Sequence, residues 1–253
     1  MIDIHTHILP GVDDGAQSME EAVAMAEKAH EAGITTIVAT PHHQNGSYIN
    51  HRHSILPAVD ELNETLKKKG IPITVLPGQE TRIYGEMAED SDELVPISGT
   101  GHYLFVEFPH DQVPRYATQL LYDLQMRGKK PIIVHPERNA AIQDEPDKLY
   151  QFVKNGALAQ VTTDSLIGKF GSTVERFAHQ LIEADLIHFA ASDAHDAEVR
   201  GFSFARAWKK VEKQHGSSVT SGWEENARRL VEGQQVVGNP PQHVRKKKFL
   251  GLF

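Results

Sequence analysis

The sequence predicts an α/β fold in which short parallel strands alternate with helices. Short apolar, β-branched runs recur along the chain, segments with helical spacing separate them, and several runs are apolar on both faces, such as Ile132-Ile133-Val134. Strands that alternate with helices of about 10–15 residues are typical of βαβ units. A strand that is apolar on both faces needs helices on both sides of its sheet. The pattern therefore predicts either a barrel or a doubly wound sheet.

Seven strands and the helices between them are predicted in chain order. The predicted strands cover residues 2–5, 35–39, 73–76, 103–108, 131–135, 157–162 and 187–191. The predicted helices cover residues 19–32, 55–69, 116–127, 146–155, 174–184, 204–214 and 223–232. Ser18 followed by Glu21 is typical of a capping box at the start of the first helix. Helix stop signals precede four of the strands, at Gly33, Gly70, Gly128 and Gly156.

Composition and charge exclude several classes of protein. The chain contains no cysteine, which excludes a disulfide scaffold, a thiolate zinc site and a cysteine nucleophile. Its formal net charge of -8 disfavours nucleic-acid binding, which depends on Lys and Arg at the phosphates. There is no secretory leader and no apolar run of ~18 residues, the length of a membrane-spanning helix. The sequence therefore predicts a cytoplasmic protein that binds no nucleic acid and has no integral membrane association.

The chain length of 253 residues suits one large α/β domain. No internal repeat and no low-complexity linker divides it, so we predict a single domain over residues 1–253. A Pro240-Pro241 break precedes a tail over about 240–253 that is basic and then apolar. The tail is predicted to be peripheral: a frayed or docked terminus, or a weak contact with a membrane surface or a partner.

Histidines and carboxylates stand at or near the ends of six of the seven predicted strands. In chain order they are His5, His7, His42, Glu80, Glu107, His135, Asp193 and His195. His5 and His7 point to the same face of their strand, because side chains alternate with a period of two. The carboxyl ends of parallel strands meet at one rim, where α/β active sites are built. The coincidence over independent strands therefore predicts a metal cluster at this rim.

The types of donor narrow the choice of metal. Imidazoles and carboxylates without thiolates suit Mn²⁺, Fe²⁺ or Zn²⁺. One catalytic ion takes about three protein ligands, so this larger set implies two or three ions, with Glu80 and Glu107 as bridges. Glu107 lies within an apolar run, where an unpaired carboxylate is costly. It therefore has a second interpretation, as one half of a buried ion pair.

These motifs resemble those of the polymerase and histidinol phosphatase (PHP) superfamily. The opening DIHTHILPGVDDG at residues 3–15, with GQE at 78–80, HPER at 135–138 and ASDAH at 191–195, is similar to the bacterial tyrosine-protein phosphatases of the CpsB/YwqE type. Those proteins are encoded beside capsule and exopolysaccharide genes. The resemblance covers nearly the whole chain. It implies a single-domain, distorted TIM-like (β/α)7 barrel of the PHP type, with the metal cluster at the C-terminal strand ends.

The resemblance also implies the site residues, most of them ligands of three Mn²⁺ ions. The first ion would be held by His5, His7, Glu80 and Asp193, the second by Glu80, Glu107 and His135, and the third by Asp14, His42 and His195. Arg138 and Arg200 match the arginines that bind the substrate phosphate, a role that suits a guanidinium fork. Without the resemblance, Asp14 before Gly15 is typical of a turn. Each of the two arginines would then be interpreted as part of a surface salt bridge. The role of His43 is open.

The predicted function is metal-dependent hydrolysis of phosphotyrosine in proteins. The predicted partners are tyrosine-phosphorylated proteins, including a bacterial tyrosine kinase, in capsule or exopolysaccharide regulation. Two alternatives are a phosphatase for histidinol phosphate or another small molecule, and a non-catalytic metal-binding regulatory module. Acidity disfavours a nucleolytic PHP module, and the lack of a bridging lysine at the strand ends disfavours an amidohydrolase. A P-loop over residues 168–173 is excluded because no Gly-Lys-Ser/Thr sequence is present.

Overall fold

The fold is built on two sheets of parallel strands in a computed structural model that describes residues 1–99 and 101–245. The strands are β1 (Ile2–Thr6), β2 (Thr36–Ala39), β3 (His42–His43), β4 (Thr74–Pro77), β5 (Glu80–Arg82), β6 (Tyr103–Glu107), β7 (Lys130–Val134), β8 (Leu158–Thr162) and β9 (Phe189–Ala191). One sheet has the order β1-β2-β4 and the other the order β3-β5-β6-β7-β8-β9. All of these neighbours pair in parallel. The predicted α/β class with parallel strands is confirmed.

The two sheets are joined at three places. Two residues separate β2 from β3, and two separate β4 from β5. At the second break Gly78 is required, because a Cβ atom there would lie 2.7 Å from Cγ1 of Val38 in the neighbouring strand. At the other edge, β1 meets the segment that follows β9 through a parallel bridge between Thr6 and Ala194. The backbone N–H of His7 donates to the Ala194 oxygen there, at 2.8 Å.

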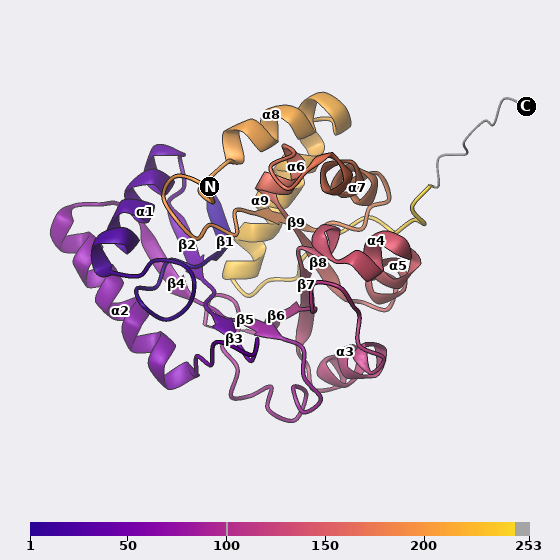
Figure 1. Cartoon of the computed structure of the whole chain (residues 1–253), viewed down its shortest axis with the longest axis horizontal. Helices are drawn as coiled ribbons and strands as arrows, with labels where there is room; N and C mark the ends of the chain where they lie inside the picture. The colour runs from indigo at the N-terminus through magenta and orange to yellow at the C-terminus, as the bar shows by residue number, and fades with distance from the viewer. Residues whose placement is uncertain (100, 246–253) are drawn as a thin grey trace, which may run out of the picture.

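Helices flank the strands, with α1 and α2 on one side of Figure 1 and α3, α4 and α5 on the other. They are α1 (Met19–Glu31), α2 (Arg52–Lys69), α3 (Ala117–Met126), α4 (Ala140–Asp144), α5 (Asp147–Lys154), α6 (Thr163–Leu166), α7 (Ser172–Glu183), α8 (Phe204–His215) and α9 (Ser217–Val231), with a 3₁₀ turn η1 (Pro136–Arg138). Half of the predicted capping box forms: Ser18 Oγ accepts from the Glu21 N–H at 3.2 Å. Glu21 in turn accepts from Gln17 rather than from Ser18.

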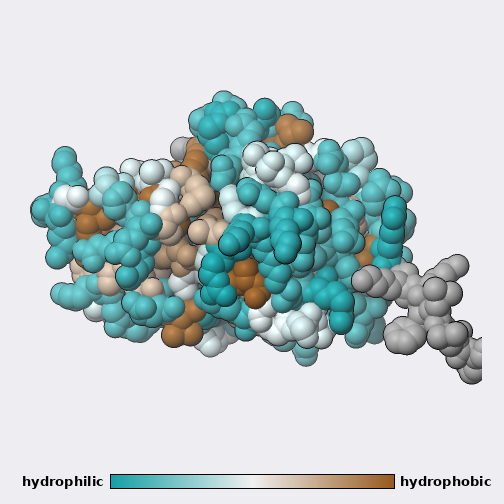
Figure 2. Space-filling view, turned by 90° about the horizontal axis from the view of Figure 1, so that it is seen from above, coloured by the Kyte–Doolittle hydropathy of each residue, from teal (hydrophilic) through white to brown (hydrophobic). Residues whose placement is uncertain are grey.

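One buried cluster draws side chains from strands of both sheets. It includes Ile4 of β1, Val38 of β2, Phe105 of β6, Ile132 of β7 and Phe189 of β9. The neighbours of these residues along the strands point outward to the helices, as the two-faced apolar pattern predicts. The exterior face seen in Figure 2 is largely hydrophilic, with hydrophobic residues in scattered patches.

The predicted elements are present with shifted ends, and four short elements, β3, β5, α4 and α6, were not predicted. α9 begins at Ser217 rather than at residue 223, and α2 at Arg52 rather than at residue 55. Part of the predicted peripheral tail is docked, because the Gln242 N–H donates to the Ala184 oxygen at 2.8 Å and Val244 packs against the core. The basic-apolar segment 246–253 lies outside the described residues. In the part of the chain that is described, no helix is long and apolar enough to span a membrane.

Candidate metal centre

The nine residues predicted as metal ligands lie together where the parallel strands end. Donor atoms within 4.8 Å of one another form four overlapping groups: His7 with Asp14, His42 and His195; His5 with His7 and Asp193; His5 with Glu80 and His135; and His42 with Glu80 and Glu107. Shared members connect these groups into one cluster. The chain order of the strands therefore brings residues from both ends of the sequence into one site.

Glu80 lies at the middle of the cluster and is completely buried. Its Oε1 is 2.7 Å from His135 Nε2, and its Oε2 is 2.9 Å from His42 Nδ1, 3.3 Å from His7 Nε2 and 3.4 Å from His5 Nε2. Burial alone would raise the pKa of Glu80, but the surrounding histidines hold it well below the usual range. Glu80 is therefore an ionised carboxylate shared by four imidazoles.

Asp193 uses its two oxygens differently. Oδ1 is 3.5 Å from His5 Nε2 and 3.3 Å from His7 Nε2. Oδ2 forms an ion pair with Arg138 at 2.7 Å and accepts a hydrogen bond from Arg200 at 3.1 Å. Burial would raise the pKa of Asp193, but Arg138 and the nearby histidines hold it well below its usual value. One oxygen is thus free to bind a metal while the other holds the two arginines in the site.

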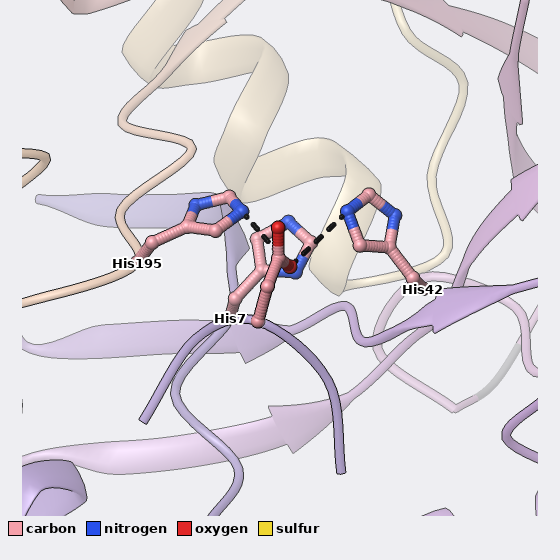
Figure 3. A group of neighbouring side chains, drawn as sticks. His7, His42 and His195 are labelled. Carbon is pink, nitrogen blue, oxygen red and sulfur yellow. Dashed lines mark ion pairs between the residues drawn. The ribbon is translucent and has the colours of Figure 1, made fainter. Parts of the chain in front are cut away.

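Asp14 stands on the open side of the cluster, with its side chain 47% exposed. Its Oδ1 is 3.4 Å from both His42 Nε2 and His195 Nε2. The rings of His42 and His195 approach from opposite sides, with His7 between them (Figure 3). The hydrogen bond from His195, against the opposing effect of burial, lowers the pKa of Asp14. The position of Asp14 fits the ligand that the resemblance implied.

Glu107 is held by an arginine that the sequence analysis did not select. Arg82 donates to Oε2 of Glu107 at 2.8 Å and to Oε1 at 2.9 Å, while His42 Nδ1 is 3.9 Å from Oε2. The ion-pair interpretation of Glu107 therefore describes a contact that the structure contains, alongside its place in the cluster. Within 4.8 Å, Glu107 is grouped with His42 and Glu80, and His135 is grouped with His5 and Glu80.

Four atoms of the cluster that could bind a metal, three ring nitrogens and one carboxylate oxygen, are buried and have no hydrogen-bond partner. They are His5 Nε2, His7 Nε2, His42 Nδ1 and Glu80 Oε2. Buried polar atoms in native proteins are almost always paired, because an unpaired one costs about 1–3 kcal/mol. Imidazole nitrogens and carboxylate oxygens that converge on one place are ligand types that suit divalent cations. The residues present therefore fit the metal ions that the sequence predicts.

The far ring nitrogens of two histidines are fixed from behind. His5 Nδ1 lies 2.9 Å from Gln160 Oε1, and His7 Nδ1 lies 2.7 Å from Asp13 Oδ2. An oxygen that accepts a hydrogen bond from Nδ1 keeps the ring proton on that nitrogen and leaves the Nε2 lone pair directed at the cluster. Asp13 also caps the turn, because its Oδ1 accepts from the Gly15 N–H at 3.0 Å. The turn-forming role predicted for Asp14 thus belongs to its neighbour.

The backbone at the site is tightly constrained. His135 and Asp193 have φ values of 36° and 55°, in the left-handed region that costs energy for residues other than glycine. A Cβ atom at Gly15 would lie 1.9 Å from the carbonyl oxygen of His7. The loop after β1 therefore needs glycine to bring Asp13 and Asp14 against the histidines.

A cleft of about 320 Å³ opens over the cluster, and Arg82, Arg138 and Arg200 line it. The Arg138 and Arg200 side chains are 18% and 35% exposed, so neither forms the surface salt bridge that was the alternative. A second cavity of about 370 Å³ lies beside α9, and no member of the cluster is among its lining residues in the described chain. The first cleft is therefore the one that adjoins the proposed chemistry.

Comparison with known proteins gives the family. The family described as "Capsular polysaccharide synthesis, CpsB/CapC" matches residues 1–232. The chain belongs to the CpsB/CapC family. It is 48% identical over 255 residues to the tyrosine-protein phosphatase YwqE of Bacillus subtilis (strain 168), with 100% of both chains covered. It is 36% identical over 258 residues to the putative tyrosine-protein phosphatase CapC of Staphylococcus aureus, again with 100% of both covered.

Comparison of the fold with a solved structure supports the same family. This CpsB/CapC chain matches a chain from the crystal structures of YwqE from Bacillus subtilis and CpsB from Streptococcus pneumoniae, described as unique metal-dependent tyrosine phosphatases. The TM-score is 0.94 at 47% identity, covering 97% of this chain and 100% of that one. The resemblance stated from the motifs is confirmed.

Sequence reasoning missed three side chains around the centre of this CpsB/CapC chain. They contact the predicted ligands but were not themselves predicted as site residues: Arg82, Asp13 and Gln160. The sequence contained a signal for Arg82, because this residue stands two positions after Glu80 and therefore lies on the same face of an extended strand. Asp13 also had one, because it lies in the opening motif six residues after His7. Gln160 had none, since its contact with His5 depends on how distant segments pack.

Proposed function

We propose that the chain is a metal-dependent tyrosine-protein phosphatase that hydrolyses phosphotyrosine in proteins. The cluster of buried, unpaired donor atoms beside two arginines in an open cleft carries this proposal. Two relatives at 48% and 36% identity are named as a tyrosine-protein phosphatase and a putative one. A third support is the solved chain at TM-score 0.94, described as metal-dependent. Three Mn²⁺ ions are proposed, with Fe²⁺ or Zn²⁺ as alternatives.

We propose further that the two sheets form one distorted (β/α)7 barrel of the PHP type, with the metal cluster at its C-terminal strand ends. In this arrangement β2 with β3, and β4 with β5, are two interrupted strands, and the bridge between Thr6 and Ala194 closes the ring. The shared core of both sheets supports it. A single domain over residues 1–253 goes with this proposal.

The proposed ion ligands are the nine clustered residues. They are His5, His7, Asp14, His42, Glu80, Glu107, His135, Asp193 and His195. Bound divalent ions supply Lewis acidity and lower the pKa of water toward neutrality. The orientation of the ligands comes from the chain itself, through the fixed histidine rings and the arginine-held carboxylates. Because the chain has no cysteine, a phosphoenzyme formed on a thiol is excluded.

Arg138 and Arg200 are proposed to bind the substrate phosphate. Each uses a terminal nitrogen on Asp193 and retains further N–H donors, since a guanidinium has five. Nε of Arg200 is buried and has no hydrogen-bond partner, which leaves a donor for an anion at the cleft. Two fixed cations beside the cluster stabilise the charge that develops on the equatorial phosphate oxygens. The phenolate of tyrosine, with a pKa of about 10, leaves without strong need of a general acid.

The proposed substrates are tyrosine-phosphorylated proteins, including a bacterial tyrosine kinase, in the cytoplasm. The family description ties the chain to capsular polysaccharide synthesis, where we propose that it acts. The competing functions are hydrolysis of histidinol phosphate or another small phosphomonoester, and a non-catalytic metal-binding module.

The deciding experiment compares substrates on one preparation. We expect the Mn²⁺-supplemented protein to hydrolyse a phosphotyrosine peptide with a higher kcat/KM than histidinol phosphate. Faster turnover of histidinol phosphate would assign the small-molecule function instead. No turnover of either substrate by protein that carries its metals would favour the regulatory module.

A further inference from the structure

A tight turn of sequence Gly168-Lys169-Phe170-Gly171 stands at the edge of the cleft, outside the metal cluster. It is closed by a hydrogen bond from the Gly171 N–H to the Gly168 oxygen at 3.0 Å. Both glycines have positive φ values, 83° and 91°, a conformation that glycine adopts without steric cost. The two glycines thus frame Phe170 at the tip of a short, defined turn.

Lys169 fastens this turn to its surroundings. Its Nζ donates to Oδ2 of the buried Asp164 at 3.1 Å and to the backbone oxygen of Val199 at 3.0 Å. Val199 directly precedes Arg200, so the turn is tied to the segment that carries one of the proposed phosphate-binding arginines. Phe170 is therefore held in place relative to the cleft.

The ring of Phe170 packs on the other arginine. Its centroid is 5.1 Å from Cζ of Arg138, within the range of a cation–π contact. Three other apolar side chains line the cleft, Phe108, Val134 and Pro136, and all three are buried. Phe170 is the one apolar residue of the lining, among the described residues, that is half-buried and so partly open to the cleft.

We propose that Phe170 is the residue that selects aryl phosphates, by packing against the substrate ring while the phosphate lies on Arg138. The inference rests on the proposed phosphatase function. One oxygen joins phosphorus to the ring in phosphotyrosine, so a phosphate bound at Arg138 brings the ring beside the aromatic neighbour of that arginine. An alkyl phosphate brings no ring. Aromatic pairs contribute enough to change affinity by roughly two- to tenfold.

A different role for Phe170 would be to hold Arg138 alone. In that case its removal would weaken every phosphate ligand equally, because the loss would lie in the arginine. Selection of the ring instead predicts a loss confined to aryl ligands. Phenylphosphonate and methylphosphonate separate the two roles, since they share the anionic group and differ in the ring.

The experiment measures these two compounds as competitive inhibitors of phosphotyrosine-peptide hydrolysis by the Mn²⁺-loaded full chain. Phe170→Ala should weaken the binding of phenylphosphonate by roughly two- to tenfold and lower kcat/KM for the peptide by a similar factor. The binding of methylphosphonate should be unchanged. Phe170→Leu should resemble Phe170→Ala, whereas Phe170→Trp should match the parent because it keeps a ring. Met126→Ala removes an exposed apolar side chain of α3 and should behave as the parent. Thermal melting of each variant checks that it is folded.

Three outcomes would overturn the inference. Equal weakening of both phosphonates would make Phe170 a positioning residue for Arg138. Unchanged binding of phenylphosphonate by folded Phe170→Ala and Phe170→Leu proteins would remove any role in recognition. In both cases an active parent leaves the proposed phosphatase function intact. A parent that carries its metals and does not hydrolyse the peptide would overturn the proposed function and this inference together.

Discussion

Arg82 differs from the other two arginines of the cleft in what it binds. Both of its hydrogen bonds go to Glu107, at 2.8 and 2.9 Å, whereas Arg138 and Arg200 share one oxygen of Asp193. Burial, followed by the charge of Glu80, raises the pKa of Glu107, and Arg82 opposes this shift. Arg82 therefore favours the ionised form of Glu107 and fixes the orientation of its carboxylate.

We expect Arg82→Ala to weaken metal binding, because it frees a carboxylate of the cluster. Loss of such a supporting contact costs about 10–100-fold in metal affinity or activity. Mn²⁺ content per chain after dialysis, determined by mass spectrometry, measures the effect. Arg127→Ala, at an exposed arginine that ends α3, is the matched control. If the Arg82→Ala variant kept its full metal content and activity, the ion pair between Arg82 and Glu107 would have no role in metal binding.

Arg138→Ala and Arg200→Ala should have the opposite signature, with the metals retained and phosphate binding weakened. Unlike Glu107, Asp193 keeps close contacts in the cluster without the arginines, because its Oδ1 lies 3.5 Å from His5 Nε2 and 3.3 Å from His7 Nε2. A charge-assisted contact in a desolvated site is worth ~1.5–3 kcal/mol, which corresponds to about one to two orders of magnitude in kcat/KM. Lysine should restore activity only in part, because it lacks the guanidinium fork. Steady-state kinetics with metal analysis on the same samples test this. Parental kinetics in either variant would remove that arginine from the site.

The two arginines should also be coupled, because both contact Oδ2 of Asp193. Residues that share a partner show non-additive effects of about 0.5–3 kcal/mol in a double-mutant cycle. We expect the double alanine variant to lose less than the product of the two single losses. Strict additivity would indicate that the arginines act independently of Asp193.

At the level of single residues, the sequence predicts which side chains gather in the cluster better than it predicts the contacts between them. Histidines at strand ends can be located from the sequence, because the positions of the strands follow from apolar periodicity. The contact between Arg82 and Glu107 depends on the pairing register of β5 with β6, in which these two residues are partners. Register between strands distant in sequence is a tertiary property, so this ion pair was predictable only as an open alternative for Glu107.

Among the secondary-structure elements, β3 and β5 were missed for a physical reason. They are short, and they carry His42, His43, Glu80 and Arg82 in place of an apolar run. Hydrophobic periodicity has nothing to detect in such strands. The longer strands were predicted because their two buried faces make continuous apolar runs.

The residue before β9 gives a prediction for pH dependence. His188 is 6% exposed, and burial, followed by the charge of Lys130, lowers its pKa to about 4. An unfolded histidine titrates near 6.5. Between these values the unfolded state binds a proton that the folded state does not, so stability is full above pH of about 6.5 and falls as the pH drops toward about 4. The loss from this group is on the order of 3 kcal/mol.

We therefore expect the free energy of unfolding to fall more steeply with acidification in the parent than in His188→Asn. Asparagine keeps an acceptor for the Ala159 N–H, which bonds His188 Nδ1 at 3.2 Å, and has no titrating proton. Urea unfolding between pH 7 and pH 4.5 measures both slopes. Identical slopes would show that His188 is protonated equally in the folded and unfolded states.

At the level of the whole molecule, the site brings four carboxylates together in an already acidic chain. Asp14, Glu80, Glu107 and Asp193 meet within the cluster, and the net charge of the chain is -8. Ions that bind only the folded state stabilise it by mass action, by about 2.7 kcal/mol at a free concentration 100 times Kd. For a domain of this size that is a rise in Tm of several degrees.

We expect chelation to lower Tm and Mn²⁺ to raise it in a concentration-dependent way. Differential scanning fluorimetry before and after chelation provides the measurement, with Ca²⁺ at equal concentration as a comparison for ionic effects. A Tm that did not respond to Mn²⁺ would argue that the donor atoms are not a binding site in solution.

The most direct test of the account is phosphate release from a phosphotyrosine peptide by exhaustively chelated protein during stepwise return of Mn²⁺. Metal content and rate are determined on the same samples. The account predicts no turnover in metal-free protein, and a rate that rises with bound Mn²⁺ until the cluster is filled. Full activity in protein shown to contain no metal would contradict it.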